Sequence, residues 1–279
     1  MRIMNLILLV LIALFSCKDE KQHTTPIIEH KNKTTSPLTK REVSYHSAPE
    51  FNDILKSAKV KGSILFYDEN TNSYFSNDFE WAKKGFIPAS TYKIPNSIIA
   101  LELGIVENDS VLFKWDGVER SFDEWNQDLI FRKAFHYSCV PIYQDITRKV
   151  GLQKMRSMVQ KFDYGNMDIT NESLDQFWLS GNSKITQFEQ IEFLRKYHHG
   201  ELPISKRTEK IAKRMMTTKY KSYPLLAKSG RSMDGVSWYV GYIIKNNDLI
   251  YFATNITDIA SFSPNQRKMV TIKAFDSLF

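Results

Sequence analysis

The sequence contains only two cysteines among its 279 residues, Cys17 and Cys139. A zinc site needs Cys and His side chains clustered at short spacing, and neither cysteine belongs to such a cluster. The sequence therefore predicts no metal site. A disulfide between the two is not expected, because Cys17 lies where N-terminal processing would consume it. Cys139 is interpreted as a buried free thiol without a redox role.

The sequence also lacks a basic run interleaved with aromatic residues, although its formal net charge is +7. Such runs are typical of nucleic-acid binding, whereas the lysines here are spread along the whole chain. The excess charge is interpreted as a solvated basic surface, and no nucleic-acid partner is predicted. The chain is 42% hydrophobic and 25% charged, which is ordinary for a globular protein with a substantial core.

No apolar run at the N-terminus is long enough to cross a bilayer. Leu6 to Phe15 spans ten residues and follows Arg2, which is the pattern of an export signal. The run ends at Ser16-Cys17 and resembles the lipobox of bacterial lipoproteins, in which a lipidated cysteine becomes the new N-terminus. A plain secretory signal is the alternative. Both interpretations place the mature protein outside the cytoplasm, and the first anchors it to a bacterial membrane, on the periplasmic or cell-surface side.

Three segments follow from these patterns. Residues 1–17 are predicted to be a lipoprotein signal peptide. Residues 18–43 are rich in Lys and Thr and offer little to bury, so they are predicted to be a flexible tether. Residues 44–279 contain no internal repeat and no second linker, and are predicted to form one domain.

Strand patterns occur at both ends of this domain, and helical patterns fill its middle. Short apolar segments with β-branched residues predict strands at 60–67, 236–245 and 249–256. Helical periodicity and capping signals predict helices at 90–106, 140–162 with a break near Gly151, 186–197, 205–216 and 263–279. This order predicts an α/β (α+β) fold: a largely antiparallel sheet from the N- and C-terminal parts, flanked by helices, with a helical subdomain.

Ser90 lies three residues before Lys93 at a predicted helix start, so both side chains share one helix face. A serine hydroxyl becomes an effective nucleophile when a base removes its proton. Burial lowers the pKa of a lysine and lets it serve as that base, and Ile94, Ile98 and Ile99 could supply an apolar pocket. By itself, however, a Ser-x-x-Lys pattern is weak, because it arises by chance in many proteins.

Three further motifs follow in order: Ser138-Cys139-Val140, Tyr164-Gly165-Asn166 and Lys228-Ser229-Gly230. Together with the first motif, they resemble the class D (oxacillinase-type) serine β-lactamases of the penicillin-binding-protein-like superfamily, from about residue 50 to the C-terminus. Class A enzymes and penicillin-binding proteins carry Ser-Asp-Asn as the second motif, whereas Ser-Cys-Val singles out class D and its sensor-domain relatives. The resemblance implies that residues 44–279 are a catalytic domain that hydrolyses the β-lactam ring of penicillin-type antibiotics.

The resemblance also implies a role for the residues around Ser90, which would form the acyl-enzyme. Lys93, carboxylated by CO2 to a carbamate, would be the general base for acylation and deacylation. Trp178 would donate a hydrogen bond that fixes the carbamate, and Val140 would pack against it and restrict water there. No cofactor other than CO2 or bicarbonate is implied.

The remaining implied roles concern the substrate. Ser138 would relay a proton to the β-lactam nitrogen, next to the positive charge of Lys228. The backbone N–H groups of Ser90 and Arg231 are candidates for the oxyanion hole. Arg267 would bind the substrate carboxylate, because a guanidinium fork suits a planar carboxylate. The other implied positions are Ser229 and Gly230 at the substrate, and Tyr164, Gly165 and Asn166 in one wall of the site.

Other functions fit parts of the pattern. The sensor domains of penicillin-responsive receptors share the motifs but stay acylated without turnover. Those receptors carry transmembrane helices and a protease domain upstream, whereas only a signal peptide is expected before this domain. A transpeptidase or carboxypeptidase is disfavoured by Ser-Cys-Val, and a non-catalytic lipoprotein would make all four motifs coincidental. The sequence leaves open whether two domains pair as a homodimer.

Overall fold

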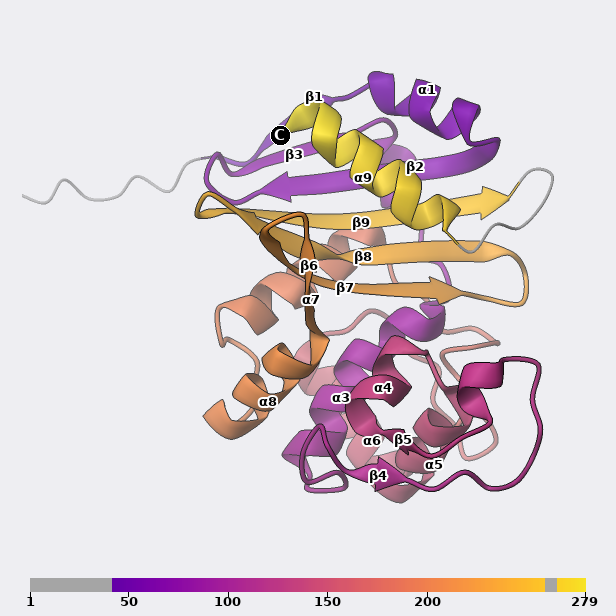
Figure 1. Ribbon diagram of the computed structural model, residues 1–279. Helices are drawn as coiled ribbons and strands as arrows, with labels where there is room; N and C mark the ends of the chain where they lie inside the picture. The colour runs from indigo at the N-terminus through magenta and orange to yellow at the C-terminus, as the bar shows by residue number, and fades with distance from the viewer. Residues whose placement is uncertain (1–41, 259–264) are drawn as a thin grey trace, which may run out of the picture. The chain divides into compact units, whose positions relative to one another are not determined.

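A seven-stranded sheet forms the centre of the computed structural model, which describes residues 42–258 and 265–279 (Figure 1). The strand order is β1-β3-β2-β9-β8-β7-β6, and neighbours pair antiparallel except for β1 with β3. The largely antiparallel sheet predicted from the two ends of the domain is thus confirmed. The strands are β1 (Ser44–Ser47), β2 (Val60–Asp68), β3 (Ser73–Ser76), β6 (Thr217–Tyr220), β7 (Tyr223–Arg231), β8 (Val236–Lys245) and β9 (Asp248–Asp258).

The predicted helices are present, with small shifts at their ends. The helix expected from residue 90 begins as a 3-10 turn, η1 (Ala89–Tyr92), and Gly151 separates α5 from α6 at a φ of 79°. The helices are α1 (Glu50–Ser57), α2 (Phe79–Ala82), α3 (Lys93–Glu102), α4 (Phe131–His136), α5 (Val140–Val150), α6 (Leu152–Phe162), α7 (Gln187–His198), α8 (Lys206–Met216) and α9 (Gln266–Leu278). A short hairpin of β4 (Leu112–Phe113) and β5 (Leu129–Ile130) encloses the 3-10 turn η2 (Asp123–Trp125).

Both faces of the sheet are buried, because successive side chains along a strand point to opposite faces. On β8, Trp238 and Val240 pack against the larger helical layer that includes α3 and α5 to α8, whereas Tyr239 and Ile243 pack against α1 and α9. Figure 1 shows α1 and α9 on one side of the sheet and α3 to α6 on the other. The larger helical layer therefore covers the face of the sheet opposite to α1 and α9.

Helix α3 lies inside this layer, and every residue from 93 to 101 is buried. A helix that is buried all round needs no polar face, and its sequence after Lys93 is mostly apolar, while the buried Asn96 donates a hydrogen bond to the Thr147 hydroxyl at 2.8 Å. Pro95 is tolerated because it lies in the first turn, where no intrahelical N–H bond is lost. Ala89, the first residue of η1, has a φ of 50°, so a sharp left-handed turn presents Ser90.

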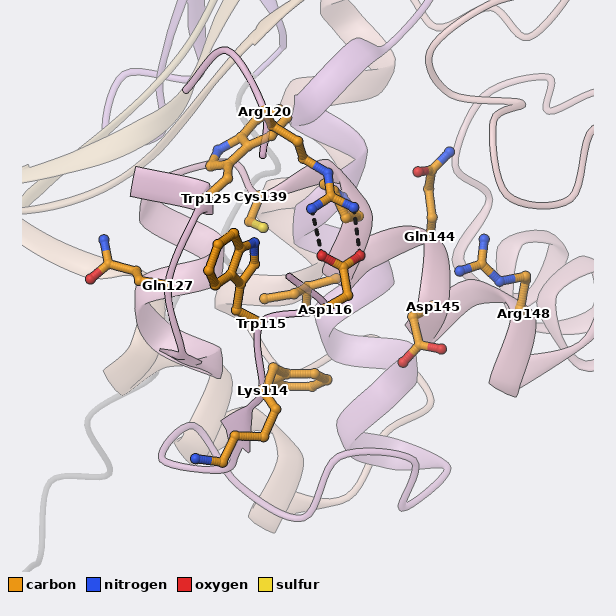
Figure 2. A pocket seen from close by; sticks show the side chains of 13 residues that line it. Lys114, Trp115, Asp116, Arg120, Trp125, Gln127, Cys139, Gln144, Asp145 and Arg148 are labelled. Carbon is orange, nitrogen blue, oxygen red and sulfur yellow. Dashed lines mark hydrogen bonds and ion pairs between the residues drawn. The ribbon is translucent and has the colours of Figure 1, made fainter. Parts of the chain in front are cut away.

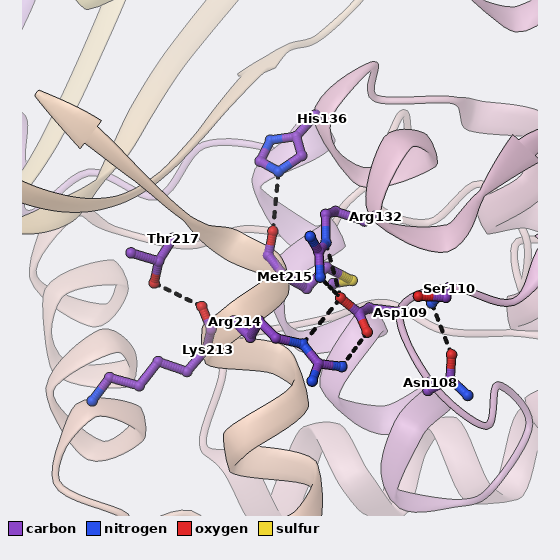
Figure 3. Close-up of polar contacts among 9 residues, drawn as sticks. All are labelled: Asn108, Asp109, Ser110, Arg132, His136, Lys213, Arg214, Met215 and Thr217. Atoms are coloured by element: carbon purple, nitrogen blue, oxygen red, sulfur yellow. Dashed lines mark hydrogen bonds and ion pairs between the residues drawn. The ribbon is translucent and has the colours of Figure 1, made fainter.

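A buried carboxylate ties two of the helices together (Figure 3). Asp109 is completely buried and accepts hydrogen bonds from the guanidinium groups of Arg132 on α4 and Arg214 on α8. Burial favours the neutral acid, but the hydrogen bonds from Arg214 and Arg132 outweigh it and lower the pKa of Asp109 below its ordinary value. Helix α4 precedes Ser138, and α8 precedes the strands β6 and β7, of which β7 carries Lys228. This ion cluster therefore links the segments that carry these two residues.

We expect Asp109→Ala to lower the free energy of unfolding by about 1–3 kcal/mol, because it removes the buried acceptor that both guanidinium groups share. Urea unfolding measures the change. The contribution should be present above the ordinary aspartate pKa of 3.8 and should disappear as the pH falls through the lower folded-state pKa. Glu80→Ala is the matched control, since Glu80 pairs with Lys83 on the surface. Equal unfolding midpoints for both variants would contradict the assigned role.

The predicted signal peptide, Cys17 and almost all of the predicted tether lie outside the described residues, as do Ser263 and Pro264 of the last predicted helix. Within the described part of the chain, no helix is both long and apolar enough to cross a membrane.

Candidate active site

Ser90 and Lys93 meet at the junction of η1 and α3. The Lys93 Nζ donates a hydrogen bond to the Ser90 Oγ over 3.0 Å. Lys93 has no exposed surface, and Ser90 is 9% exposed. Burial lowers the pKa of Lys93 from 10.5 to about 7, so much of the amine is uncharged near neutral pH. A neutral amine in contact with a serine hydroxyl can accept its proton.

The aromatic ring next to this amine belongs to Tyr143 on α5, whose centroid lies 5.1 Å from the Lys93 Nζ. The Tyr143 hydroxyl hydrogen-bonds to the Ser97 Oγ at 2.6 Å, and the same Oγ donates to the Lys93 carbonyl at 2.7 Å. Sequence reasoning proposed isoleucines around Lys93 and missed Tyr143. The helical spacing could have revealed it, because Tyr143 lies one turn after Val140.

Trp178 lies behind η1 in a cluster of aromatic rings. Its ring stacks on that of Tyr92 at 5.6 Å between centroids, with an interplanar angle of 21°, and Phe177 contacts both rings edge-on. Trp178 is fully buried, and its indole N–H has no hydrogen-bond partner within the described residues. Leaving a buried donor without an acceptor destabilises the folded protein by about 1–3 kcal/mol, so we expect this N–H to have an acceptor in the active enzyme.

Ser138 and Lys228 meet at the other side of the site. The Lys228 Nζ donates to the Ser138 Oγ and, at 2.9 Å, to the Ser229 carbonyl. Burial lowers the pKa of Lys228 well below 10.5, and the positive charges of Lys93 and Arg267 lower it further. Val140, which is expected to pack near Lys93, follows Ser138 by two residues. It begins α5 and is half-buried.

Strand β7 approaches Ser90 closely. Among the described strands, β6 pairs only with residues 223–226 of β7. The remaining residues of β7, 227–231, therefore form an edge of the sheet, and β7 contacts η1. A Cβ on Gly230 would lie 2.9 Å from the Ser90 nitrogen and 3.1 Å from the Pro88 oxygen. Only glycine permits this approach. It brings the end of β7, where Arg231 follows Gly230, next to the backbone of Ser90.

Arg267 and Lys228 line one cavity of about 180 Å³ at the N-terminal end of α9. The Ser229 backbone and His136 also line it. His136 is a site neighbour that sequence reasoning missed, and its Nε2 hydrogen-bonds to the Met215 carbonyl at 3.0 Å. The cavity gathers the side chains of Lys228, Arg267 and Lys268 beside the serine motifs, which suits an anionic substrate group.

The motif Tyr164-Gly165-Asn166 supports the site from behind. The ring of Tyr164 contacts that of Tyr92 edge-on at 5.7 Å. Gly165 has a φ of 58°, and a Cβ there would lie 2.6 Å from the Lys184 oxygen. Asn166 and Lys184 exchange two backbone hydrogen bonds of 2.9 and 2.7 Å. Tyr164 thus packs against Tyr92 in the aromatic cluster, and the backbone pairing of Asn166 holds the motif in place.

No three His, Cys, Asp or Glu side chains are placed to hold a metal ion within residues 42–258 and 265–279. The chemistry that the described residues support is acyl transfer: a serine with an adjacent base, a second serine with its own lysine, and backbone N–H groups close to the nucleophile.

Comparison with known proteins agrees with this chemistry. The penicillin-binding protein transpeptidase domain family matches residues 57–273. The β-lactamase OXA-48 of Klebsiella pneumoniae is 39% identical over 217 residues, which cover 76% of this chain and 82% of that protein. OXA-10 of Pseudomonas aeruginosa is 35% identical over 234 residues, covering 81% and 88%. The solved class D β-lactamase YbXI from Nostoc has a TM-score of 0.79 at 38% identity, covering 82% of this chain and 98% of that one.

Fold and site together define a penicillin-binding-type acyl-transfer domain. Within that class, the chain belongs to the class D β-lactamases. The resemblance inferred from the four sequence motifs is confirmed.

Proposed function

We propose that this class D enzyme hydrolyses the β-lactam ring of penicillin-type antibiotics through an acyl-enzyme on Ser90. The observation that carries the proposal is the 3.0 Å contact between the Ser90 Oγ and a fully buried Lys93 amine whose pKa is about 7. A serine with such a neighbour can be deprotonated at physiological pH.

Acylation begins when the Ser90 Oγ attacks the lactam carbonyl carbon and its proton passes to the base at Lys93. The negative charge on the carbonyl oxygen would be stabilised by the N–H groups of Ser90 and Arg231. The C–N bond then breaks, and the nitrogen takes a proton from the Ser138 Oγ. Lys228, hydrogen-bonded to that oxygen, can replace the proton.

A carbamate on Lys93 would supply an anionic base at this position. The pocket suits it in two ways. A carbamate oxygen would satisfy the buried indole N–H of Trp178. Replacing the positive charge of Lys93 would also remove one of the causes that lower the Lys228 pKa, so Lys228 would hold its proton more firmly.

Deacylation would use the same base, after Lys93 has released to solvent the proton taken from Ser90 and Lys228 has taken one up from solvent to replace the proton given to Ser138. A water molecule deprotonated at Lys93 attacks the acyl carbonyl carbon, the ester bond to the Ser90 Oγ breaks, and the proton returns to that oxygen. Val140, at the start of α5, would restrict how water reaches the base. Arg267 and Lys228 would hold the substrate carboxylate during both steps.

We also propose that the enzyme works outside the cytoplasm, held to a bacterial membrane through lipid on Cys17. This proposal is supported by the export-signal and lipobox pattern of residues 1–17 and by the polar composition of residues 18–43.

The function is tested by mixing the protein with a chromogenic cephalosporin in excess. We expect continuing turnover, which rises when bicarbonate is added, because CO2 would then keep Lys93 carboxylated. A single stoichiometric burst without further turnover would instead identify a β-lactam sensor. Since no metal takes part in the proposed route, a chelator should leave the rate unchanged.

Trp178→Phe tests the carbamate directly. The variant keeps an aromatic ring but loses the N–H, and a hydrogen bond to an ionised group contributes about 1.5–3 kcal/mol. We therefore expect half-maximal activity to require about 10- to 150-fold more bicarbonate. Trp115→Phe is the matched control, because Trp115 is 40% exposed and donates to the Val118 carbonyl instead. The same bicarbonate dependence in wild type and Trp178→Phe would refute this role.

A further inference from the structure

The peptide bond that links Tyr137 to Ser138 is held at both ends. Its N–H, which belongs to Ser138, donates to the Phe135 carbonyl at 3.1 Å. Its carbonyl, which belongs to Tyr137, accepts the indole N–H of Trp125 at 2.9 Å. The first bond is the ordinary ending of α4, whereas the second comes from a loop that precedes the helix.

This peptide needs such support because Ser138 has a φ of 54°. The left-handed conformation costs a non-glycine residue about 1–2 kcal/mol. Rotation of the peptide toward an ordinary conformation would break the bond to Trp125 and turn the Ser138 side chain away from Lys228. The geometry required for proton transfer thus depends on a bond made to the neighbouring carbonyl.

The loop that carries Trp125 is itself held in place. The backbone N–H of Arg120 donates to the Asn126 side chain, whose amide donates back to the Arg120 carbonyl, both at 2.8 Å. The ring of Phe122 lies 4.6 Å from that of Trp125. Figure 2 shows Trp125 beside Arg120, whose guanidinium group binds Asp116 through two hydrogen bonds. These contacts therefore hold the Trp125 side chain in position to donate to the Tyr137 carbonyl.

We infer that Trp125 is a positioning residue for Ser138 in ring opening. It acts through the Tyr137 carbonyl, keeping the Ser138 Oγ beside Lys228 so that its proton reaches the departing nitrogen. The inference rests on the proposed role of Ser138. Because ring opening belongs to acylation, Trp125 matters for acylation and not for attack by water on the acyl-enzyme.

Trp115 offers a matched comparison within the same loop (Figure 2). Its indole N–H also donates to a backbone carbonyl, that of Val118, at 3.0 Å. That carbonyl belongs to the loop and not to the Tyr137–Ser138 peptide. Replacing either tryptophan by phenylalanine removes one N–H and keeps an aromatic ring, so the two variants differ in which peptide loses its anchor.

Rapid-mixing kinetics with a chromogenic cephalosporin measure acylation and deacylation separately. We expect Trp125→Phe to slow acylation by about 10- to 100-fold, since small misplacements of a reacting group have effects of this size. Deacylation should stay within about twofold of wild type. Trp115→Phe should match wild type in both steps. Circular dichroism and thermal unfolding of both variants confirm that each is folded.

A double-mutant cycle with Ser138→Ala tests the route of action. In that background, Trp125→Phe should cause no further loss of acylation. A full additional loss would overturn the inference, as would equal slowing by Trp115→Phe. Two β-lactams with small and bulky side chains should be slowed by the same factor in Trp125→Phe, because an effect on the bulky one alone would mark direct substrate contact. Wild-type acylation by Ser138→Ala would instead refute the proposed role of Ser138.

Discussion

Ser90→Ala is expected to abolish steady-state hydrolysis of β-lactams, with kcat reduced by about a million-fold. This is the size of the loss when the nucleophile of a serine hydrolase is removed. The alanine variant has no oxygen to bond to the lactam carbonyl carbon, so no acyl-enzyme can form. Substrate should still bind, because the Lys228 and Arg267 side chains remain. The rate is followed with a chromogenic cephalosporin.

Intact-protein mass spectrometry provides a second measurement. Wild type quenched during turnover should carry the mass of one opened β-lactam, and Ser90→Ala should carry none. Ser57→Ala is the matched control, because Ser57 lies exposed at the end of α1. An acyl adduct on Ser90→Ala would show that another residue is the nucleophile.

Lys93→Ala should impair both half-reactions, with acylation slowed and deacylation nearly stopped. A general base contributes about 10²- to 10⁴-fold to each proton transfer, and Lys93 would serve in two of them. The variant should therefore accumulate as a long-lived acyl-enzyme after prolonged incubation. Lys154→Ala, at an exposed position on α6, should behave as wild type. Normal turnover by Lys93→Ala would refute its role as the base.

The pH dependence of the wild-type enzyme follows from the same residue. Burial lowers the pKa of Lys93 to about 7, so the neutral amine prevails above pH 7 and falls about tenfold for each pH unit below pH 6. Only the neutral amine reacts with CO2. Without added bicarbonate, activity should fall as the pH drops from 8 to 6, and bicarbonate should move this loss to lower pH. A loss at the same pH with and without bicarbonate would contradict the carbamate.

The elements that sequence reasoning located well are those with local signals. Thr186 and Glu189 form the capping box that opens α7, and both of its hydrogen bonds are present. Gly151 divides α5 from α6, and Asn246 and Asn247 adopt the positive φ values of a tight turn between β8 and β9. Each signal depends on residues within a few positions of one another, so the chain displays it before folding.

The contacts that sequence reasoning missed join residues distant in the chain. Asp109 meets Arg214 across 105 positions, and nothing in either segment names the other as its partner. Trp125 binds the Tyr137 carbonyl, but a tryptophan in a polar loop has no pattern that identifies its acceptor. The family resemblance named Trp178 as a donor, but only the packing around it shows that its N–H has no partner within the described residues.

The sequence by itself determined the motif order, the fold class and the family, because Ser90–Lys93 spacing, Ser-Cys-Val and the strand and helix periods are all local properties of the chain. Only the tertiary structure decided the environment that makes these residues reactive. Burial of Lys93 arises inside the helical layer, the approach of Gly230 to Ser90 arises where the β7 edge meets η1, and the anchoring of Ser138 comes from the loop that carries Trp125. A pKa and a strained backbone depend on everything that surrounds them, and packing alone sets those surroundings.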